Sequence, residues 1–179
     1  MRSFIAVELD RSLVPKVTDI QSRITEGKIK FVEPENLHFT LKFLGEITEQ
    51  KAQSVISHVK EVCSPFSPFT VQLKKVGVFP SLNYVRVIWI GTESEEFYTL
   101  SKLVDSSMAK LGFRQEKDIT PHLTVGRVKT PGDKARLRDQ IESLADAEIG
   151  EMIVSSVVLK KSELTRKGPI YTNIEEITL

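Results

Sequence analysis

The sequence predicts an α+β fold of two interlocked lobes, each with a mostly antiparallel sheet and helices packed outside it. Short, β-prone runs alternate with amphipathic helical patterns through both halves of the chain. In each half, a strand that carries His-x-Thr is followed by a helix. No low-complexity segment separates the halves, and 179 residues are enough to bury a sizeable core. We therefore expect residues 1–179 to form a single bilobal domain.

The first half contains two helices whose starts are marked by capping residues. Asp10 and Thr48 each precede a helical pattern, as N-cap residues do. Pro15 lies close enough to the start of the first helix to be tolerated there. The predicted elements are a strand over residues 4–9, a helix over 10–26, a strand over 29–32, the first His strand over 36–45, a helix over 48–62 and a strand over 69–79.

The second half repeats this alternation of strands and helices. A turn at residues 80–83 leads into its first strand, and Gly112 is a suitable C-terminal cap for the helix that follows. Pro131 and Gly132 interrupt the chain after the second His strand. The predicted elements are a strand over residues 84–90, a helix over 95–111, the second His strand over 121–128, a helix over 133–144, and strands over 148–160 and 170–177.

Composition excludes several classes of protein. The formal net charge of +1 argues against tight, non-specific binding of polyanions over the whole surface. The single cysteine, Cys63, falls on the apolar side of a predicted helix and is expected to be a buried structural thiol. The N-terminal apolar run is too short for a signal peptide, and no run reaches membrane-spanning length. These features predict a soluble protein of the cytoplasm.

Two of the three histidines begin the strings that carry the chemistry. His38 and His122 are each followed two residues later by a threonine, Thr40 and Thr124. Both pairs lie in β-prone runs, and residues i and i+2 of a strand point to the same face. Each half therefore offers one imidazole and one hydroxyl side by side. The third histidine, His58, has no threonine partner and is expected to be a surface or boundary residue of its helix.

Two facing imidazoles suit acid–base catalysis at a phosphate. The unperturbed pKa of imidazole is about 6.5, so a neutral ring can take a proton while a protonated ring gives one. Each such transfer contributes roughly 10²–10⁴-fold to the rate. The threonine hydroxyls can donate hydrogen bonds to the non-bridging phosphate oxygens. Facing pairs suit an in-line displacement, in which the attacking and leaving oxygens lie on opposite sides of phosphorus.

Metal binding is the chemical alternative. A site with two histidines usually needs carboxylates or a third histidine nearby, and a His-Glu-x-x-His pattern is absent. Glu33 and Glu46 flank the first motif but have no counterpart beside the second. We therefore predict that the protein uses no metal and no other cofactor.

Basic residues near the motifs are the remaining candidates for substrate binding. Under strict alternation Lys42 shares the face of His38, where it either meets a phosphate or is an exposed strand lysine. The same alternation turns Arg127 away from His122, unless a bulge beside Gly126 re-aims it. Three further basic pairs, which form either an RNA-binding rim or ordinary solvated surface, lie at residues 74–75, 160–161 and 166–167.

Four stretches of the chain resemble the 2H phosphoesterase superfamily. They are FIAV at residues 4–7, ENLHFTLKFLG at 35–45, TPHLTVGRV at 120–128 and GPIY at 168–171. Within the superfamily the chain is similar, nearly end to end, to the bacterial and archaeal RNA 2′,3′-cyclic phosphodiesterases, also called 2′-5′ RNA ligases. At the last position of the second motif, Val125 stands where leucine is commoner, a change expected to affect only packing.

The resemblance implies a central cleft on a pseudo-twofold axis, with one motif from each lobe. It also implies metal-free opening of RNA 2′,3′-cyclic phosphates to 2′-phosphomonoesters, with ATP-independent 2′-5′ ligation as the related reaction. By this resemblance His38 is the proton donor, His122 is the acceptor and Arg127 contacts phosphate or substrate. The expected partners are RNA ends, including tRNA fragments, and the expected state is a monomer.

Two other functions are compatible with the same residues. One is an RNA-end binding module without catalysis, which would not need two titratable groups. The other is a 2H enzyme acting on a small cyclic phosphate, such as ADP-ribose 1″,2″-cyclic phosphate. The sequence does not separate this last function from RNA hydrolysis, because it does not reveal the width of the cleft.

Overall fold

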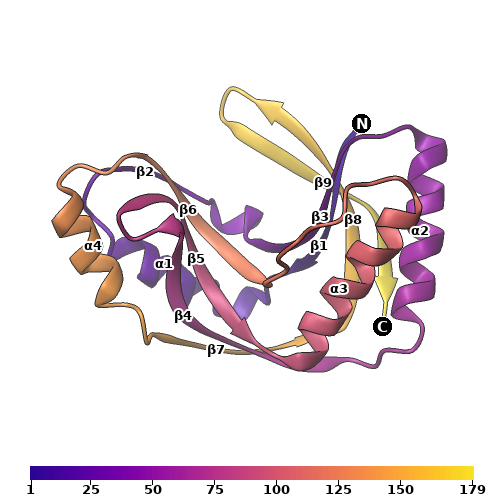
Figure 1. Cartoon of the computed structure of the whole chain (residues 1–179), viewed down its shortest axis with the longest axis horizontal. Helices are drawn as coiled ribbons and strands as arrows, with labels where there is room; N and C mark the ends of the chain where they lie inside the picture. The colour runs from indigo at the N-terminus through magenta and orange to yellow at the C-terminus, as the bar shows by residue number, and fades with distance from the viewer.

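The computed structural model describes all residues 1–179 and contains one antiparallel sheet of nine strands with four α-helices (Figure 1). The elements are β1 (Arg2–Glu8), α1 (Val14–Ser22), β2 (Lys28–Phe31), β3 (His38–Glu46), α2 (Glu49–Cys63), β4 (Phe69–Ser81), β5 (Tyr84–Glu93), α3 (Glu95–Lys110), β6 (His122–Thr130), α4 (Lys134–Glu142), β7 (Glu148–Val154), β8 (Ser156–Thr165) and β9 (Gly168–Thr178). Short 3₁₀ turns at Arg11–Leu13 and Pro34–Asn36 precede α1 and β3.

The two motif strands lie at the centre of this sheet. Its order is β7-β4-β5-β6-β3-β1-β8-β9, so each motif strand is followed outward by three strands of its own lobe. Strand β2 pairs with β6 beside this path. Strands β3 and β6 themselves pair only at Phe39 and Leu123, the residues between each His and its Thr. The lobes therefore meet at the motifs and diverge on either side of them.

The helices interlock the two lobes. Helices α2 and α3 pack together beside β3 and β9, although α3 follows β5 of the other lobe in the chain. Conversely, α1 follows β1 in the chain but packs against β6, and α4 packs against β4. At the centre of the core the buried Phe39 and Phe97 rings meet edge to face, with centroids 5.4 Å apart. No helix is long and apolar enough to cross a membrane.

The predicted α+β class and antiparallel pairing are confirmed, but two details of the sheet differ. One sheet runs through both lobes, where a separate sheet was expected in each. The single strand predicted over residues 148–160 is two strands. Strand β7 pairs with β4 as far as Val154, and β8, which begins at Ser156, pairs with β1 at residues 158–161. Apolar, β-prone residues continue on both sides of Ser155, so the sequence gives no sign of such a crossing between lobes.

The first helix is shorter than predicted. Asp10 does act as a cap, but its carboxylate accepts from Ser12 N at the start of the 3₁₀ turn, and α1 begins only at Val14 and ends at Ser22. The cap of α2 is confirmed, since Thr48 Oγ1 accepts from Lys51 N at 3.1 Å. Gly112 follows α3 with a φ of 90°, the left-handed conformation that favours glycine.

Candidate active site

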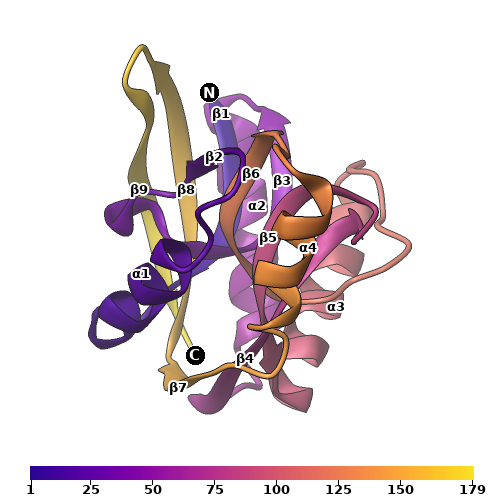
Figure 2. The same ribbon diagram turned by 90° about the vertical axis from the view of Figure 1, so that its left-hand side faces the viewer.

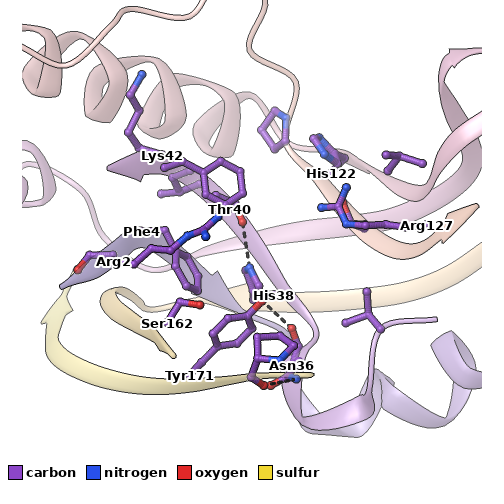
Figure 3. Close-up of a pocket in the computed structure, with 18 of the residues that line it drawn as sticks. Arg2, Phe4, Asn36, His38, Thr40, Lys42, His122, Arg127, Ser162 and Tyr171 are labelled. Carbon is purple, nitrogen blue, oxygen red and sulfur yellow. Dashed lines mark hydrogen bonds between the residues drawn. The ribbon is translucent and has the colours of Figure 1, made fainter. Parts of the chain in front are cut away.

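A cleft of about 840 Å³ separates the lobes, and both motifs open into it. Its lining includes every candidate site residue predicted from the sequence (Figure 3). These residues are His38, Thr40, Lys42, His122, Thr124 and Arg127. The histidines, the threonines and Arg127 line this one cleft, whereas the ammonium of Lys42 is directed into an ion pair with Asp105.

A β-bulge shapes the first motif strand. Adjacent residues of β1 oppose Thr40 and Lys42, so Leu41 is an extra residue in β3. The bulge reverses the alternation, and Lys42 is buried at 4% exposure whereas Phe43 faces the cleft at 70% exposure. The expectation that Lys42 shares the face of His38 is therefore wrong, and Phe43 occupies that place.

The second motif strand carries the same bulge. Adjacent residues of β5 oppose Thr124 and Gly126, so Val125 is the extra residue in β6. Arg127 is exposed and lines the cleft, as predicted for the case of a bulge beside Gly126. The first six residues of β3 and β6 have the same sequence of buried and exposed positions.

Both histidines are held in the same tautomer. Nδ1 of His38 lies 2.7 Å from the carbonyl oxygen of Asn36, and Nδ1 of His122 lies 2.8 Å from that of Thr120. A carbonyl oxygen can only accept, so each Nδ1 carries the hydrogen. The Nε2 atoms are therefore the ones free to exchange protons with a substrate.

His38 is enclosed by aromatic rings. Its ring centroid lies 4.9 Å from that of Phe4 and 5.3 Å from that of Tyr171, which stands edge-on to it. Nε2 is 2.9 Å from Thr40 Oγ1, which donates to the neutral ring. Burial lowers the pKa of His38, and the charge of Lys160 lowers it further, whereas the Asn36 carbonyl and Glu8 raise it.

His122 has a more open setting. Phe79 stands edge-on to its ring, with centroids 5.1 Å apart, and Trp89 lies 6.3 Å away. Its Nδ1 hydrogen bond is exposed, whereas that of His38 is partly buried. No protein atom hydrogen-bonds its Nε2. This nitrogen is available to a water molecule or hydroxyl in the cleft.

Lys42 is part of a buried ion pair. Its Nζ donates to Asp105 Oδ1 at 2.6 Å, and the two side chains are 3% and 1% exposed. It also donates to the carbonyl oxygen of Arg114, in the segment that connects α3 to β6. The same Asp105 carboxylate accepts from Glu116 N at 3.1 Å. Lys42 thus fastens the segment leading to His122 and is neither a phosphate ligand nor an exposed lysine here.

The other residues singled out from the sequence are a structural cysteine, a histidine outside the cleft, and basic pairs of which two form ion pairs. Burial raises the pKa of the Cys63 thiol to about 11, as expected of a structural cysteine. His58 lies in α2, outside the cleft lining, with Nδ1 3.3 Å from Ser107 Oγ. Lys74 and Lys75 pair with Glu93, and Lys160 and Lys161 pair with Glu8 and Glu163. Of the basic pairs, only the one at residues 166–167 is free, in the exposed turn between β8 and β9.

The two motifs by themselves did not predict which side chains surround the histidines. Phe4 and Tyr171 lie in stretches that carry the resemblance, yet nothing local indicated that they enclose His38. Burial raises the pKa of the Tyr171 phenol, and the charges of Arg127 and Arg2 oppose that rise. The structure has no cluster of three or more His, Cys, Asp or Glu residues that could hold a metal ion.

Comparison with known proteins assigns the family. The family model described as LigT like phosphoesterase matches residues 7–89 and again residues 90–171, so that each match contains one His-x-Thr strand. The chain belongs to the LigT-like phosphoesterase family. This agrees with the resemblance to the 2H superfamily that the two motifs indicate.

Members of the family with curated names are similar over their whole length. An RNA 2′,3′-cyclic phosphodiesterase of Methanothermobacter thermautotrophicus is 45% identical over 100% of this chain and 99% of that relative. One of Methanocaldococcus jannaschii is 39% identical over 98% of this chain and 99% of that relative.

Solved structures of LigT-like phosphoesterases share the fold. A Thermus thermophilus protein superimposes with a TM-score of 0.85 at 28% identity, covering 100% of this chain and 98% of that one. E. coli LigT complexed with 3′-AMP gives a TM-score of 0.77 at 21% identity, covering 99% and 97%.

Proposed function

We propose that this protein is an RNA 2′,3′-cyclic phosphodiesterase that opens the cyclic phosphate to a 2′-phosphomonoester. The observation that carries the proposal is the pair of matched strands, each with an imidazole fixed through Nδ1 and a threonine on the same face of one cleft. The names of the full-length relatives in two archaea support the same activity.

The geometry suits a displacement that needs only protein groups. Nε2 of His122 takes a proton from water as the water oxygen bonds to phosphorus. The bond from phosphorus to the 3′ oxygen breaks on the opposite side, and Nε2–H of His38 gives that oxygen its proton. Thr40, Thr124 and Arg127 bind the non-bridging oxygens, where negative charge must be stabilised. Proton exchange with water then restores both rings.

For His38 to act as the acid, its ring must be protonated, and the charge of the bound substrate favours that form. Burial lowers the pKa of His38, which favours the neutral ring in the free enzyme. A bound phosphodiester places a negative charge beside this ring and favours the protonated form. We therefore expect substrate binding to promote protonation of His38. The reverse assignment of roles would place the leaving oxygen beside His122 instead.

The same site can also carry out ligation, and it is complete within one chain. If a 5′ hydroxyl takes the place of the attacking water, the product is a 2′-5′ linkage formed without ATP. One chain supplies both histidines and both threonines, so a monomer is sufficient, and light scattering tests this state. We also propose that the protein acts in the cytoplasm.

Two other functions make different predictions. An RNA-end binding module would hold the cyclic phosphate without opening it. An enzyme for small cyclic phosphates would turn over ADP-ribose 1″,2″-cyclic phosphate faster than an RNA end. The two titratable rings favour catalysis over binding alone, because binding a phosphate requires donors but no proton transfer.

The test is incubation with an oligoribonucleotide that ends in a 2′,3′-cyclic phosphate, followed by analysis of the terminal phosphate. We expect a 2′-phosphate as the main product, formed equally well in excess EDTA. A 3′-phosphate would reverse the direction of opening. Loss of activity on chelation, with recovery on adding zinc or manganese, would make the histidines metal ligands.

A further inference from the structure

Four cations line the cleft without forming an ion pair. They are Arg2, Lys30, Arg127 and Lys167. The lysines of β8 give the contrast, since Lys160 and Lys161 are both paired with glutamates. Unpaired cations beside a phosphate site are available to further phosphates of a nucleic acid.

These cations lie on two sides of the reacting centre. Arg127 in β6 and Lys30 in β2 are paired in register, in the lobe that contains His122. Arg2 extends from the start of β1 into the cleft on the side of His38 and Tyr171 (Figure 3). Lys167 lies in the turn of the β8–β9 hairpin, which projects beyond the rest of the first lobe (Figure 2).

The backbone under Arg2 is firmly held. The amino group of Met1 donates to the Ile47 carbonyl oxygen at 2.8 Å and lies 3.1 Å from the Glu46 carboxylate. Ser3, the next residue of β1, pairs with Lys161 of β8. Arg2 is thus fixed between the motif strand and the hairpin that carries Lys167.

The chemistry of the substrate selects one of the two sides. Both esterified oxygens of a 2′,3′-cyclic phosphate belong to one ribose, and the RNA strand continues from that ribose through its 5′ carbon. In an in-line displacement the ribose lies on the side of the leaving oxygen. With His38 as the acid, that is the side of β1, β8 and β9.

We propose that Arg2 and Lys167 bind the phosphodiester that precedes the terminal nucleotide, and so make the enzyme selective for RNA strands over mononucleotides. This inference rests on the proposed function, because it assumes that the cyclic phosphate is opened at the two motifs. Lys30 lies on the attacking side and has no part in it.

The experiment compares three substrates with the full chain. They are adenosine 2′,3′-cyclic phosphate, the dinucleotide ApA with a 2′,3′-cyclic phosphate end, and the same dinucleotide with a neutral methylphosphonate linkage. The wild type should show a kcat/KM roughly tenfold higher on the charged dinucleotide than on either other substrate, the scale of one hydrogen-bonded charge contact. The slope of log kcat/KM against log salt should be steeper for the charged dinucleotide by about 0.7.

Three variants assign the effect to residues. In Arg2→Gln and Lys167→Gln the preference for the charged dinucleotide should fall severalfold, and in the double variant it should approach one. Arg166→Gln is the matched control, because it removes the same charge one residue away, outside the cleft lining. It should keep the wild-type preference.

The outcomes separate this inference from the proposed function. If the wild type opens none of the three substrates, the proposed function fails. If it opens all three with equal kcat/KM, the proposed function stands and the second phosphate site is wrong. If Lys30→Gln abolishes the preference and the Arg2 variant keeps it, the RNA strand runs past β2 and β6 on the side of His122, and the assignment to Arg2 and Lys167 is wrong. The comparison of the charged and the neutral dinucleotide uses only the wild type, so it tests the inference even if a variant does not fold.

Discussion

The two motif strands have the same backbone and different surroundings. Strands β3 and β6 share the His-x-Thr spacing, the bulge at the fourth residue and the Nδ1 bond to the carbonyl two residues earlier. Around them, His38 is packed between Phe4 and Tyr171, while His122 keeps Nε2 open to the cleft. The motif therefore supplies a ring and a hydroxyl, and the residues around it decide which proton transfer each ring performs.

The positions after the bulge extend this comparison. The fifth residue is the ion-paired Lys42 in β3 and Gly126 in β6, where an added Cβ would come within 3.0 Å of Ile29. The sixth residue, which faces the cleft, is the apolar Phe43 in β3 and the cationic Arg127 in β6. The two halves of the site are therefore equivalent in geometry but not in charge.

The largest expected effect is loss of either histidine. His38→Asn and His122→Asn should each lower kcat by roughly 10²–10⁴-fold, because each removes one proton transfer. The double variant should be little worse than either single one, since groups that act as a unit are strongly non-additive. Rates of cyclic phosphate opening measure this, and His58→Ala is the control that should behave as wild type. Small, additive losses at the two motifs would show that they do not act as a pair.

The next largest effect concerns Lys42, the fifth residue of β3, and it is an effect on the stability of the fold. Lys42→Met leaves the buried Asp105 carboxylate without its cation, which should lower the free energy of unfolding by about 3–5 kcal/mol. Adding Asp105→Asn removes that charge and keeps an acceptor for Glu116 N, so much of the loss should be recovered. Urea titration measures both changes.

The control for this pair is an exposed one. Lys161→Met breaks the pair with Glu163, whose side chains are 38% and 56% exposed, and should change stability by less than about 1 kcal/mol. If Lys42→Met were equally mild, the buried pair would not hold the segment before His122 in place.

A smaller effect distinguishes the two threonines. Thr40→Val and Thr124→Val keep the β-branched shape and remove one donor to the phosphate, which should cost roughly 1–3 kcal/mol in kcat/KM. Only Thr40 is hydrogen-bonded to its histidine, so only Thr40→Val should also move the midpoint of the pH–rate profile that reports His38. Wild-type kinetics in both variants would leave these residues as strand positions only.

The parts predictable from sequence are those set by local patterns. Alternation and capping residues predicted most elements, and the doubled His-x-Thr motif predicted which side chains share the cleft. The bulge at Leu41 was not predictable, because strict alternation gives no reason to expect an extra residue there. For this reason Lys42 was misplaced, whereas Gly126 gave a hint that correctly re-aimed Arg127.

Contacts between distant segments account for the rest. The partner of Lys42 lies in α3, and Tyr171 comes from the last strand to pack on His38. Neither contact follows a short-range spacing rule, because each depends on how the lobes interlock. The split of residues 148–160 between β7 and β8 has the same origin, since both parts contain β-prone apolar residues but each pairs with a different lobe.

The smallest expected effect tests how the surroundings of His38 set its proton affinity. Burial lowers the pKa of this ring, Lys160 lowers it further and Glu8 raises it, so Glu8→Gln should lower its NMR titration midpoint and Lys160→Met should raise it. Because the folded pKa lies below the unfolded value of about 6.5, the unfolded chain takes up this proton first as the pH falls. His38 therefore contributes a loss of stability as the pH drops from about 6.5 toward the folded pKa, and His38→Gln should flatten that slope. A nucleoside 2′-phosphate, which brings negative charge to the ring, should raise the midpoint in the wild type. If the midpoint stayed unchanged when the ligand bound, His38 would remain neutral with substrate present and the acid role would pass to His122.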